Sequence, residues 1–431
     1  MKRLVWTWLA ACTLWLGGAA AGMTQAENAD AAPETAPSAE AGLEAVVTDG
    51  LALLEAHRLK PDPETARAAL LEALIRSAAP SAEFLDEDEL AARTRRMTER
   101  EWDTGLALVA VADGLPKVAA VRADSPADIA GIQPGELIER VGGHEILSDT
   151  PLKLVREWLS GGESAELDVM IRGEDGASRT DSLERVRRDG PAVEDKEDLP
   201  AGIGYTRMEG LFPGAGTETA AALREWNEAG MIGAVLDLRG AGGSAWEEIG
   251  DIAVWFSPDP DGLFAMTDRG GNPELSEQAA LENPDMKVDM PLMVLVDEGT
   301  TGAAELLAAV LAGSTKGTML IGRETAGDPM IREPVALPTG GYALLPTRQV
   351  RTADGTVYAG VDGVQPDVLI TDAALNETVY EPEEPILSRK KNGPTEEDLE
   401  DKALRERTRN DTYLRRATDM LLGLQALGYG Q

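Results

Sequence analysis

One segment constrains the fold more than any other: residues 294–310, which read Val-Leu-Val-Asp-Glu-Gly-Thr-Thr-Gly-Ala-Ala-Glu-Leu-Leu-Ala-Ala-Val. The apolar start is typical of a buried strand, the glycines and threonines of a tight turn, and the alanine- and leucine-rich end of a helix. A strand that turns sharply into a helix is a common way to present a nucleophile at a helix N-terminus. The segment therefore predicts an α/β core with a candidate reaction site at this turn.

The chain from Gly202 onward repeats this rhythm of strand and helix. Apolar strand-like runs alternate with helical patterns, the strands at 203–208, 234–238, 292–296 and 318–321 and the helices around 217–229, 246–256 and 303–311. Such alternation is typical of an α/β domain, which we expect over residues 200–375. Residues 376–431 form a C-terminal extension, charged and extended over 376–412 and ending in an amphipathic helix.

The first residues have the pattern of an export signal. Lys2 and Arg3 precede an apolar run over 4–16, and small residues follow. Residues 1–22 are therefore predicted to be a signal peptide, which places the protein in the periplasm or cell envelope. Cys12, the single cysteine, lies in Leu-Ala-Ala-Cys, which also resembles a lipoprotein cleavage box, so a lipid anchor at Cys12 is the alternative to soluble export. We expect no integral membrane span in the mature chain.

Composition and periodicity divide the rest of the N-terminal half. Residues 23–40 are rich in Ala, Glu, Pro and Ser and are predicted to be a disordered linker. Residues 41–100 have apolar positions three and four apart, which predicts a helical N-terminal part. Residues 101–188 contain short β-rich runs between glycine- and proline-marked turns, with one helix among them.

The region 101–188 resembles a PDZ domain of the bacterial processing-protease type. The residues that carry this resemblance are Ser-Pro-Ala-Asp-Ile-Ala-Gly-Ile-Gln-Pro-Gly-Glu-Leu-Ile at 125–138 and Val-Gly-Gly at 141–143. The resemblance implies an edge where a chain terminus adds as a strand and where backbone amides receive its carboxylate. That edge follows Thr104, Gly105, Leu106, Ala107 and Leu108. A domain that serves only for packing is the alternative.

With its flanks, the chain resembles the tail-specific, or carboxyl-terminal processing, peptidase family over nearly all of the mature length. The pieces occur in the family's order: the helical-domain turn at 79–90, the PDZ domain, and then 202–205, 236–239 with Gly242-Gly243, 299–305, 322–327 and 363–367. The resemblance implies a multi-domain fold of the α+β and α/β classes. It would combine the helical N-terminal part, the PDZ domain and a crotonase-like (ββα) α/β protease domain.

Members of this family are understood to use a serine nucleophile with a lysine as general base. Their nucleophile turn reads roughly Gly-Ser-Ala-Ser-Ala-Ser-Glu, with the middle serine catalytic; the matching residues 299–305 place Gly302 at that position. Their lysine lies in Thr-Phe-Gly-Lys-Gly, and the matching residues 325–329 place Asp328 there. Both reacting groups are therefore missing.

The resemblance also implies that the backbone amides of Gly243 and Ala303 form an oxyanion hole. Without a nucleophile, these amides could still bind a carbonyl or carboxylate of a peptide. No cofactor is expected, and no group of His, Cys and Asp has metal-ligand spacing.

Other hydroxyl groups are candidates for a replacement nucleophile. Thr300 and Thr301 flank the turn, although a role as helix caps is favoured for both. Ser314 and Lys316 form a Ser-x-Lys pair after the helix, where a polar connecting loop is favoured.

The sequence thus predicts an exported, catalytically inactive homologue of these proteases, which binds polypeptide C-termini through its PDZ domain and vacant cleft. One alternative is an active serine-type endopeptidase of envelope proteins that uses a relocated pair such as Ser314 and Lys316. The other is a structural envelope protein. Expected partners are polypeptide C-termini or a protein partner, for instance an active relative. The formal charge of −36 argues against nucleic acid as a partner.

Overall fold

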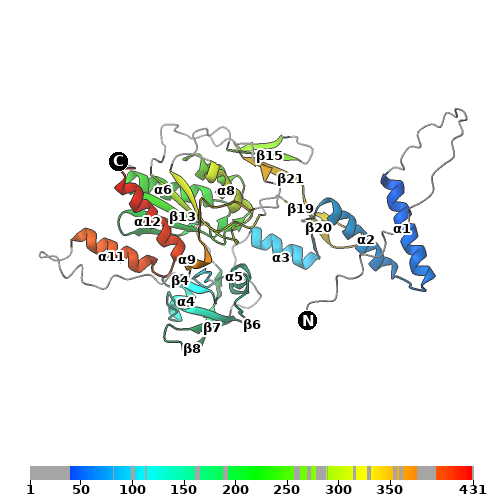
Figure 1. Cartoon of the computed structure of the whole chain (residues 1–431), viewed down its shortest axis with the longest axis horizontal. Helices are drawn as coiled ribbons and strands as arrows, with labels where there is room; N and C mark the ends of the chain where they lie inside the picture. Colours follow the sequence, from blue (N-terminus) through cyan, green and yellow to red (C-terminus); the bar gives the residue numbers. More distant parts are fainter. Residues whose placement is uncertain are drawn as a thin grey trace, which may run out of the picture. The chain divides into compact units, whose positions relative to one another are not determined.

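The computed structural model describes most of the chain (Figure 1), and the described residues divide into two units, one up to Ala66 and the other from Arg67 onward. The described residues are 39–80, 82–98, 102–111, 114–160, 166–187, 193–256, 263–268, 273–277, 288, 290–313, 317–327, 332–352, 357–358, 363–375 and 395–429. The predicted signal peptide therefore lies outside them, as does the predicted linker up to residue 38. No helix in the described part of the chain is long and apolar enough to cross a membrane.

The predicted helical N-terminal part begins with α1 (Ala39–Ala56) and α2 (Pro63–Ala78). Helix α1 thus starts two residues inside the segment predicted as linker. Helix α2 begins at Pro63, where the missing proline N–H costs no helical hydrogen bond, and Asp62 accepts the Thr65 N–H at 2.9 Å. Several apolar side chains of the two helices are exposed: Leu43, Val46, Leu51 and Leu53 on α1, and Leu70 and Leu74 on α2.

The PDZ region is an antiparallel sheet with two helices. Its strands, in spatial order, are β3 (Leu106–Val109), β4 (Lys117–Val121), β5 (Leu137–Val141), β7 (Glu166–Arg172) and β8 (Ser178–Glu184), with β6 (His144–Glu145) paired to β5. The helices are α4 (Pro126–Ile129) and α5 (Leu152–Ser160). Val118, Ile138, Val155 and Val169 form part of its fully buried core. Strand β3 is an edge strand of this sheet.

The main sheet of the protease-like region is largely parallel. In spatial order it contains β10 (Val193–Leu199), β11 (Ile203–Met208), β13 (Gly233–Asp237), β17 (Leu292–Val296), β18 (Thr318–Gly322) and β23 (Val368–Leu369). Only the β10–β11 pair is antiparallel. Every residue of β13 and β17 is buried, as expected for strands covered on both faces.

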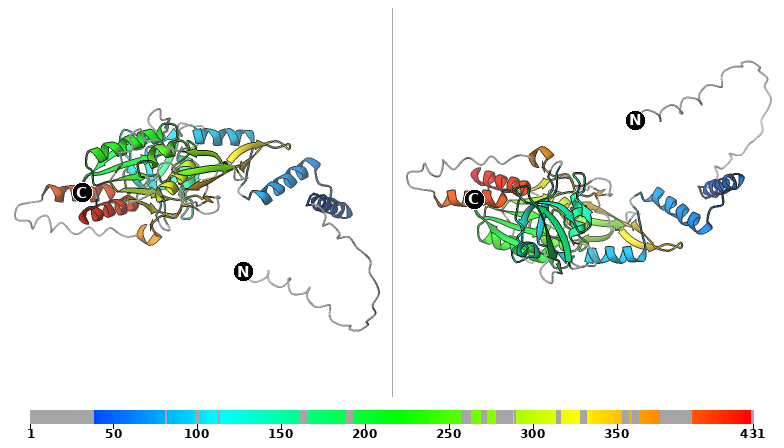
Figure 2. Two further views of the ribbon diagram at one scale, coloured as in Figure 1. Left: turned by 90° about the horizontal axis from the view of Figure 1, so that it is seen from above. Right: turned by 90° about the horizontal axis from the view of Figure 1, so that it is seen from below.

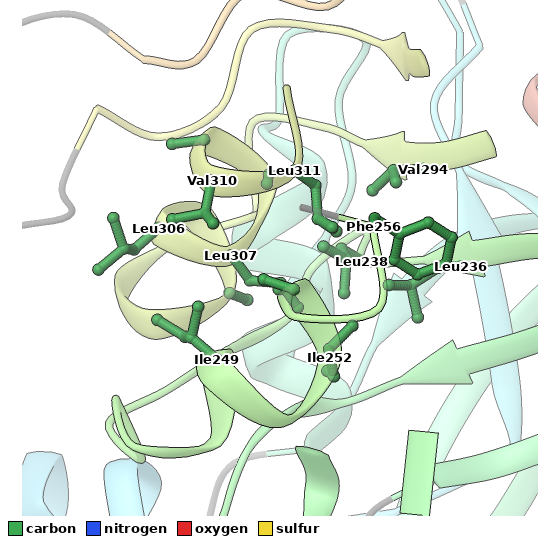
Figure 3. Packing of buried hydrophobic residues seen from close by; sticks show 14 of the residues in the cluster. Leu236, Leu238, Ile249, Ile252, Phe256, Val294, Leu306, Leu307, Val310 and Leu311 are labelled. Carbon is green, nitrogen blue, oxygen red and sulfur yellow. The ribbon is translucent and has the colours of Figure 1, made fainter. Parts of the chain in front are cut away.

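Helices cover both faces of this sheet. One face packs against α6 (Ala215–Glu228), α7 (Glu248–Ala253) and α8 (Gly302–Gly313), and Figure 3 shows side chains of α7 and α8 meeting those of β13 and β17. The other face packs against α9 (Asp372–Leu375), α11 (Glu396–Thr408) and α12 (Thr412–Ala426). Helices α11 and α12, orange to red in Figure 2, lie side by side.

Smaller elements complete the fold. They are the strands β1 (Glu83–Leu85), β19 (Arg332–Ala336) and β20 (Tyr342–Pro346); β15 (Phe264–Asp268), β16 (Pro273–Glu277), β21 (Arg348–Thr352) and β22 (Val357–Tyr358); β12 (Gly210–Leu211) and β14 (Gly242–Gly243); β2 (Trp102–Asp103) and β9 (Val186–Arg187); and the helix α3 (Glu87–Thr98). Because β1 pairs with β20, a strand from the N-terminal part adds to a sheet of the C-terminal half.

The predicted multi-domain α+β and α/β class is confirmed, whereas the description of the C-terminal extension needs correction. Within the stretch expected to be extended, residues 396–408 form α11, because Thr395 and Asp398 make a reciprocal capping box and Arg405 pairs with Asp401 one turn away. The final helix is present as α12. Its predicted apolar face is buried only in part, since Leu427 lies beyond the helix and is 77% exposed.

Candidate active site

The predicted nucleophile turn connects β17 to α8. Both backbone amides that Asp297 binds, those of Gly240 and Gly299, lie 2.9 Å from the same carboxylate oxygen, Oδ1. The Thr300 hydroxyl is buried; it donates to the Leu238 carbonyl at 2.8 Å and accepts the Asp297 N–H. The turn is therefore held both by hydrogen bonds within it and by hydrogen bonds to Leu238 and Gly240, which follow β13.

Gly302 is the first residue of α8 and has a φ of +58°, in the left-handed region that favours glycine. A Cβ added at Gly302 would lie 2.8 Å from the carbonyl oxygen of Gly243. The structure thus brings Gly243 next to the predicted nucleophile position, with its carbonyl oxygen facing Gly302. A serine could occupy this position only if the backbone moved.

The glycine turn after β13 is fixed to the nucleophile turn. The Thr301 N–H donates to the Ala241 carbonyl at 2.9 Å, and β14, which contains Gly243, pairs with β12. Gly243 has a φ of +95°, and a Cβ there would collide with the Leu211 backbone. Ala303, the other predicted oxyanion residue, is buried in the first turn of α8. The two turns therefore form one connected backbone structure.

The turn that should carry the general base lies against the start of α8. The Ala326 N–H donates to the Thr300 carbonyl at 3.0 Å, and the Gly327 N–H donates to Glu305 Oε1 at 2.7 Å. The Thr325 hydroxyl also donates to Glu305, which is fully buried. Asp328 itself lies outside the described residues, so its role at the lysine position remains a prediction.

Glu305 is a site residue to which sequence reasoning gave no role. It anchors two groups of the base turn, at Thr325 and Gly327, to the nucleophile helix. Its signal in the sequence was a single acidic residue within the otherwise apolar run Ala-Ala-Glu-Leu-Leu-Ala-Ala-Val. A buried carboxylate in such a run needs hydrogen-bond donors from outside the helix.

A buried ion network lies behind the glycine turn. The Arg239 guanidinium binds Asp237, at the end of β13, and Asp411, which caps α12. Tyr205 donates its hydroxyl to Asp237 at 3.0 Å. Burial raises the pKa of Asp237, but the charge of Arg239 outweighs it and holds that pKa well below its usual range. Asp411 was not singled out in the sequence, because its partner is 172 residues away.

The predicted peptide-binding loop of the PDZ region is packed against α4. Gly105 has a φ of +82°, and a Cβ there would lie 2.1 Å from atoms of Ser125, the N-cap of α4. The Thr104 carbonyl accepts the Ala127 N–H at 3.0 Å. On β3, Leu106 and Ala107 are half-buried and Leu108 belongs to the core.

One cavity of about 280 Å³ is lined by both the PDZ region and the protease-like region. Thr104 and Leu106 line it from the PDZ side, and Gly243 and Thr301 from the other. A second cavity, of about 650 Å³, shares Leu106 with the first and is also lined by Gly105 and Ala107. Thr104 and Leu106 of the predicted peptide edge therefore line the same cavity as Gly243 and Thr301.

The replacement nucleophiles differ in position. Thr301 is half-buried on the cavity wall, whereas the hydroxyl of Thr300 is engaged in the turn. Ser314 and Lys316 lie outside the described residues; they follow Gly313, which is about 16 Å along α8 from Gly302 at about 1.5 Å per residue. Within the described residues, no group of three or more His, Cys, Asp or Glu side chains could hold a metal ion.

Comparisons with known proteins agree with this architecture. Residues 202–370 match peptidase family S41, and residues 117–170 match the PDZ domain. These matches support the resemblance to the tail-specific protease family. Among its relatives, a carboxyl-terminal-processing protease of Synechocystis is 27% identical over 52% of this chain and 52% of its own length. The chloroplastic C-terminal processing peptidase of Tetradesmus obliquus is 27% identical over 74% of this chain and 71% of its own.

The chain thus spans about half the length of the Synechocystis relative. Among solved structures, a photosystem II D1 C-terminal processing protease is similar over 70% of this chain and 81% of its own, with a TM-score of 0.44 and 23% identity.

Proposed function

We propose that this chain is a catalytically inactive member of the tail-specific protease family that binds polypeptide C-termini through its PDZ region and the adjoining cleft. The observation that carries the proposal is at Gly302. The position has no side chain, its backbone is left-handed, and the carbonyl oxygen of Gly243 lies where a nucleophile's Cβ would need space. A protease of this type attacks through a side-chain hydroxyl, so it cannot react from this position.

The binding part of the proposal rests on the shared cavity. A peptide that adds to the edge strand β3 would run beside Thr104 and Leu106, both of which line the cavity that reaches Gly243. Strand addition supplies affinity through backbone hydrogen bonds, which need no particular side chain at the cleft. Loss of the nucleophile therefore leaves this binding mode available.

Binding is tested with a fluorescent peptide library in which each peptide is made with a free and with an amidated C-terminus. We expect the free carboxylate to bind at least about tenfold more tightly, equivalent to about 1.4 kcal/mol. A Gly105→Ala variant should lose binding, because its Cβ would collide with Ser125. The matched control is Gly131→Ala, which has a similar positive φ but open space around it. Indifference of every bound peptide to amidation contradicts C-terminal capture and favours the structural alternative.

Inactivity is tested with a fluorophosphonate probe and with casein. We expect no covalent label above that of heat-denatured protein and no casein fragments. Among the candidate replacement nucleophiles, Thr301 has the strongest structural support, since it lies on the cavity wall. Labelling that disappears in Thr301→Val, or in Ser314→Ala for the relocated pair, would instead identify an active endopeptidase.

Export and partner choice are part of the same proposal. The support for export is the pattern of residues 1–22, and the test is fractionation of cells that express the full chain or a chain without those residues. Retention of the full chain in the cytoplasm would refute it. Signal cleavage that globomycin blocks, with the product kept in the membrane fraction, would identify the lipid anchor at Cys12 instead of soluble export. An active relative is the protein partner to test first, by co-purification from the envelope fraction.

A further inference from the structure

Arg156 crosses from the PDZ region to the nucleophile turn. It lies on α5, and its Nη2 donates to the Leu108 carbonyl at 3.1 Å and to Asp297 Oδ2 at 2.9 Å. Leu108 belongs to the edge strand β3, along which a bound peptide would run. One guanidinium therefore contacts both the peptide edge and the turn that precedes α8.

The guanidinium occupies a defined slot. A Cβ added to either Gly240 or Gly299 would lie 2.8 Å from Arg156 Nη1, so these two glycines leave the space that it fills. The Asp297 side chain is 3% exposed; its Oδ1 accepts the two glycine amides, and its Oδ2 is left for the cation. We call this space, formed by Asp297, Gly240 and Gly299, the Asp297 slot.

The slot needs a positive charge. Burial raises the pKa of Asp297, but the charge and hydrogen bond of Arg156 outweigh it, so the carboxylate stays ionised. A buried carboxylate without a paired cation is strongly unfavourable. If Arg156 leaves, another cation must replace it or the turn loses stability.

Arg156 is an imperfect occupant of the slot. Its Nε and Nη1 are buried, and neither has a hydrogen-bond partner within the described part of the chain. Buried donors without acceptors oppose the arrangement that buries them. The return of Arg156 to solvent would relieve this cost for its own Nε and Nη1.

We propose that the Asp297 slot is a guanidinium-binding site, filled by Arg156 in the free protein and by an arginine side chain of the bound polypeptide in the complex. This inference rests on the proposed function, because it names the class of polypeptide that the site takes. A strand that pairs with β3 competes with Arg156 for the Leu108 carbonyl, and its arginine then takes the place of Arg156 at Asp297. The formal charge of −36 also favours a basic ligand, since it attracts cations over long range.

The first test compares arginine with citrulline, a neutral side chain of nearly the same shape. Labelled decapeptides with free C-termini carry one arginine or one citrulline at each position in turn, and fluorescence anisotropy with the full chain gives their affinities. In Arg156→Ala, where the slot is vacant, we expect the best arginine peptide to bind at least about tenfold more tightly than its citrulline counterpart. Wild type should discriminate less, because Arg156 competes.

The matched control is Lys153→Ala, which removes a neighbouring cation of α5 that lines the cavity but forms no ion pair with Asp297. It should discriminate as wild type does. Equal affinity of Arg156→Ala for arginine and citrulline at every position would overturn the inference while leaving C-terminal capture intact. Absence of peptide binding by every variant would instead refute the proposed function. The guanidinium site would then be tested separately by the second experiment, which needs no peptide.

The second test needs no peptide. Ethylguanidinium chloride is titrated into Arg156→Ala, with N-ethylurea as the neutral probe, and the thermal midpoint is measured. We expect ethylguanidinium to raise the midpoint saturably, N-ethylurea to leave it unchanged, and wild type to show no such rise because its slot is filled. The double variant Arg156→Ala/Asp297→Asn should lose the effect. A midpoint of folded Arg156→Ala that responds equally to both probes would contradict a guanidinium site.

Discussion

The nucleophile turn and the PDZ edge differ in which features of a protease of this family are present. At the nucleophile turn the scaffold is intact, with Asp297 and Thr300 holding the backbone, but Gly302 offers no reacting atom. At the PDZ edge the recognition strand β3 is present, and its Leu108 carbonyl is engaged by Arg156. One region has no hydroxyl at the predicted nucleophile position, and in the other a side chain contacts the predicted binding edge.

This difference shows that a reaction and the scaffold behind it depend on different numbers of residues. The reaction needs one nucleophile and one base, so two substitutions remove it. The scaffold depends on many buried contacts, such as those of Asp237, Arg239 and Glu305, and each is costly to lose. A chain can therefore lose its catalytic side chains and still keep the cleft as a binding surface.

The largest effect is expected from Arg239→Ala, which challenges the claim that the scaffold of the nucleophile region is intact and stabilising. The substitution leaves Asp237 and Asp411 buried without their cation, which should lower the free energy of unfolding by about 3–5 kcal/mol. Urea denaturation followed by tryptophan fluorescence measures the change. A loss below about 1 kcal/mol would mean that this network does not support the turn.

Acid should weaken the nucleophile region by protonating the buried carboxylates of Asp237 and Asp297. Asp237 and Asp297 have folded-state pKa values below the ordinary 3.8, because Arg239 and Arg156 outweigh the effect of burial. Groups with lowered pKa values add stability above pH 4 and lose it as the pH falls below that value. Urea midpoints between pH 7 and pH 3 should therefore fall steeply below pH 4.

The pH experiment has an internal control in Asp297→Asn, which removes one of these two buried carboxylates. Its loss of stability between pH 4 and pH 3 should be smaller than that of wild type. An identical slope would show that Asp297 makes no contribution to the acid response.

A serine at position 302 tests whether the nucleophile turn differs from that of an active protease only in this side chain. Gly302→Ser should lower the free energy of unfolding by about 1–3 kcal/mol, because φ is +58° and the Gly243 carbonyl lies 2.8 Å from the new Cβ. The control is Gly313→Ala at the other end of α8, where nothing lies within 4 Å of the added Cβ. Its stability should be unchanged or slightly higher.

Activity is measured on the same variants. Gly302→Ser alone should not cleave casein, since no base is supplied. Gly302→Ser with Asp328→Lys should recover cleavage only if the Gly243 carbonyl moves away from the serine. Cleavage by the single variant would show that the cleft has kept a base that the described residues do not reveal.

The smallest effect is expected at an exposed ion pair outside both regions. Arg405→Ala on α11 breaks its contact with Asp401, and the two side chains are 61% and 47% exposed. The free energy of unfolding should change by less than about 1 kcal/mol, because water screens such pairs. A larger loss of stability in Arg405→Ala would contradict the expectation that exposed ion pairs contribute much less than the buried Arg239 network.

Much of the fold could be predicted from the sequence because the main strands are buried on both faces. Runs such as Leu292–Val296 are apolar throughout, and their order along the chain indicates a parallel sheet. The prediction was wrong over 396–408, which forms α11, because high charge was read as an extended chain. Pairs one helical turn apart and a capping box stabilise that helix despite its charge.

The sequence by itself determined that residue 302 carries no hydroxyl, since this can be read from the residue name. It also indicated the order of the domains, because local patterns of apolar residues and glycines depend on near neighbours. Only the tertiary structure decided that the Gly243 carbonyl faces Gly302, that Asp411 completes the Arg239 network, and that Arg156 fills the Asp297 slot. These contacts join residues far apart in the chain, and their geometry depends on how the strands and helices pack.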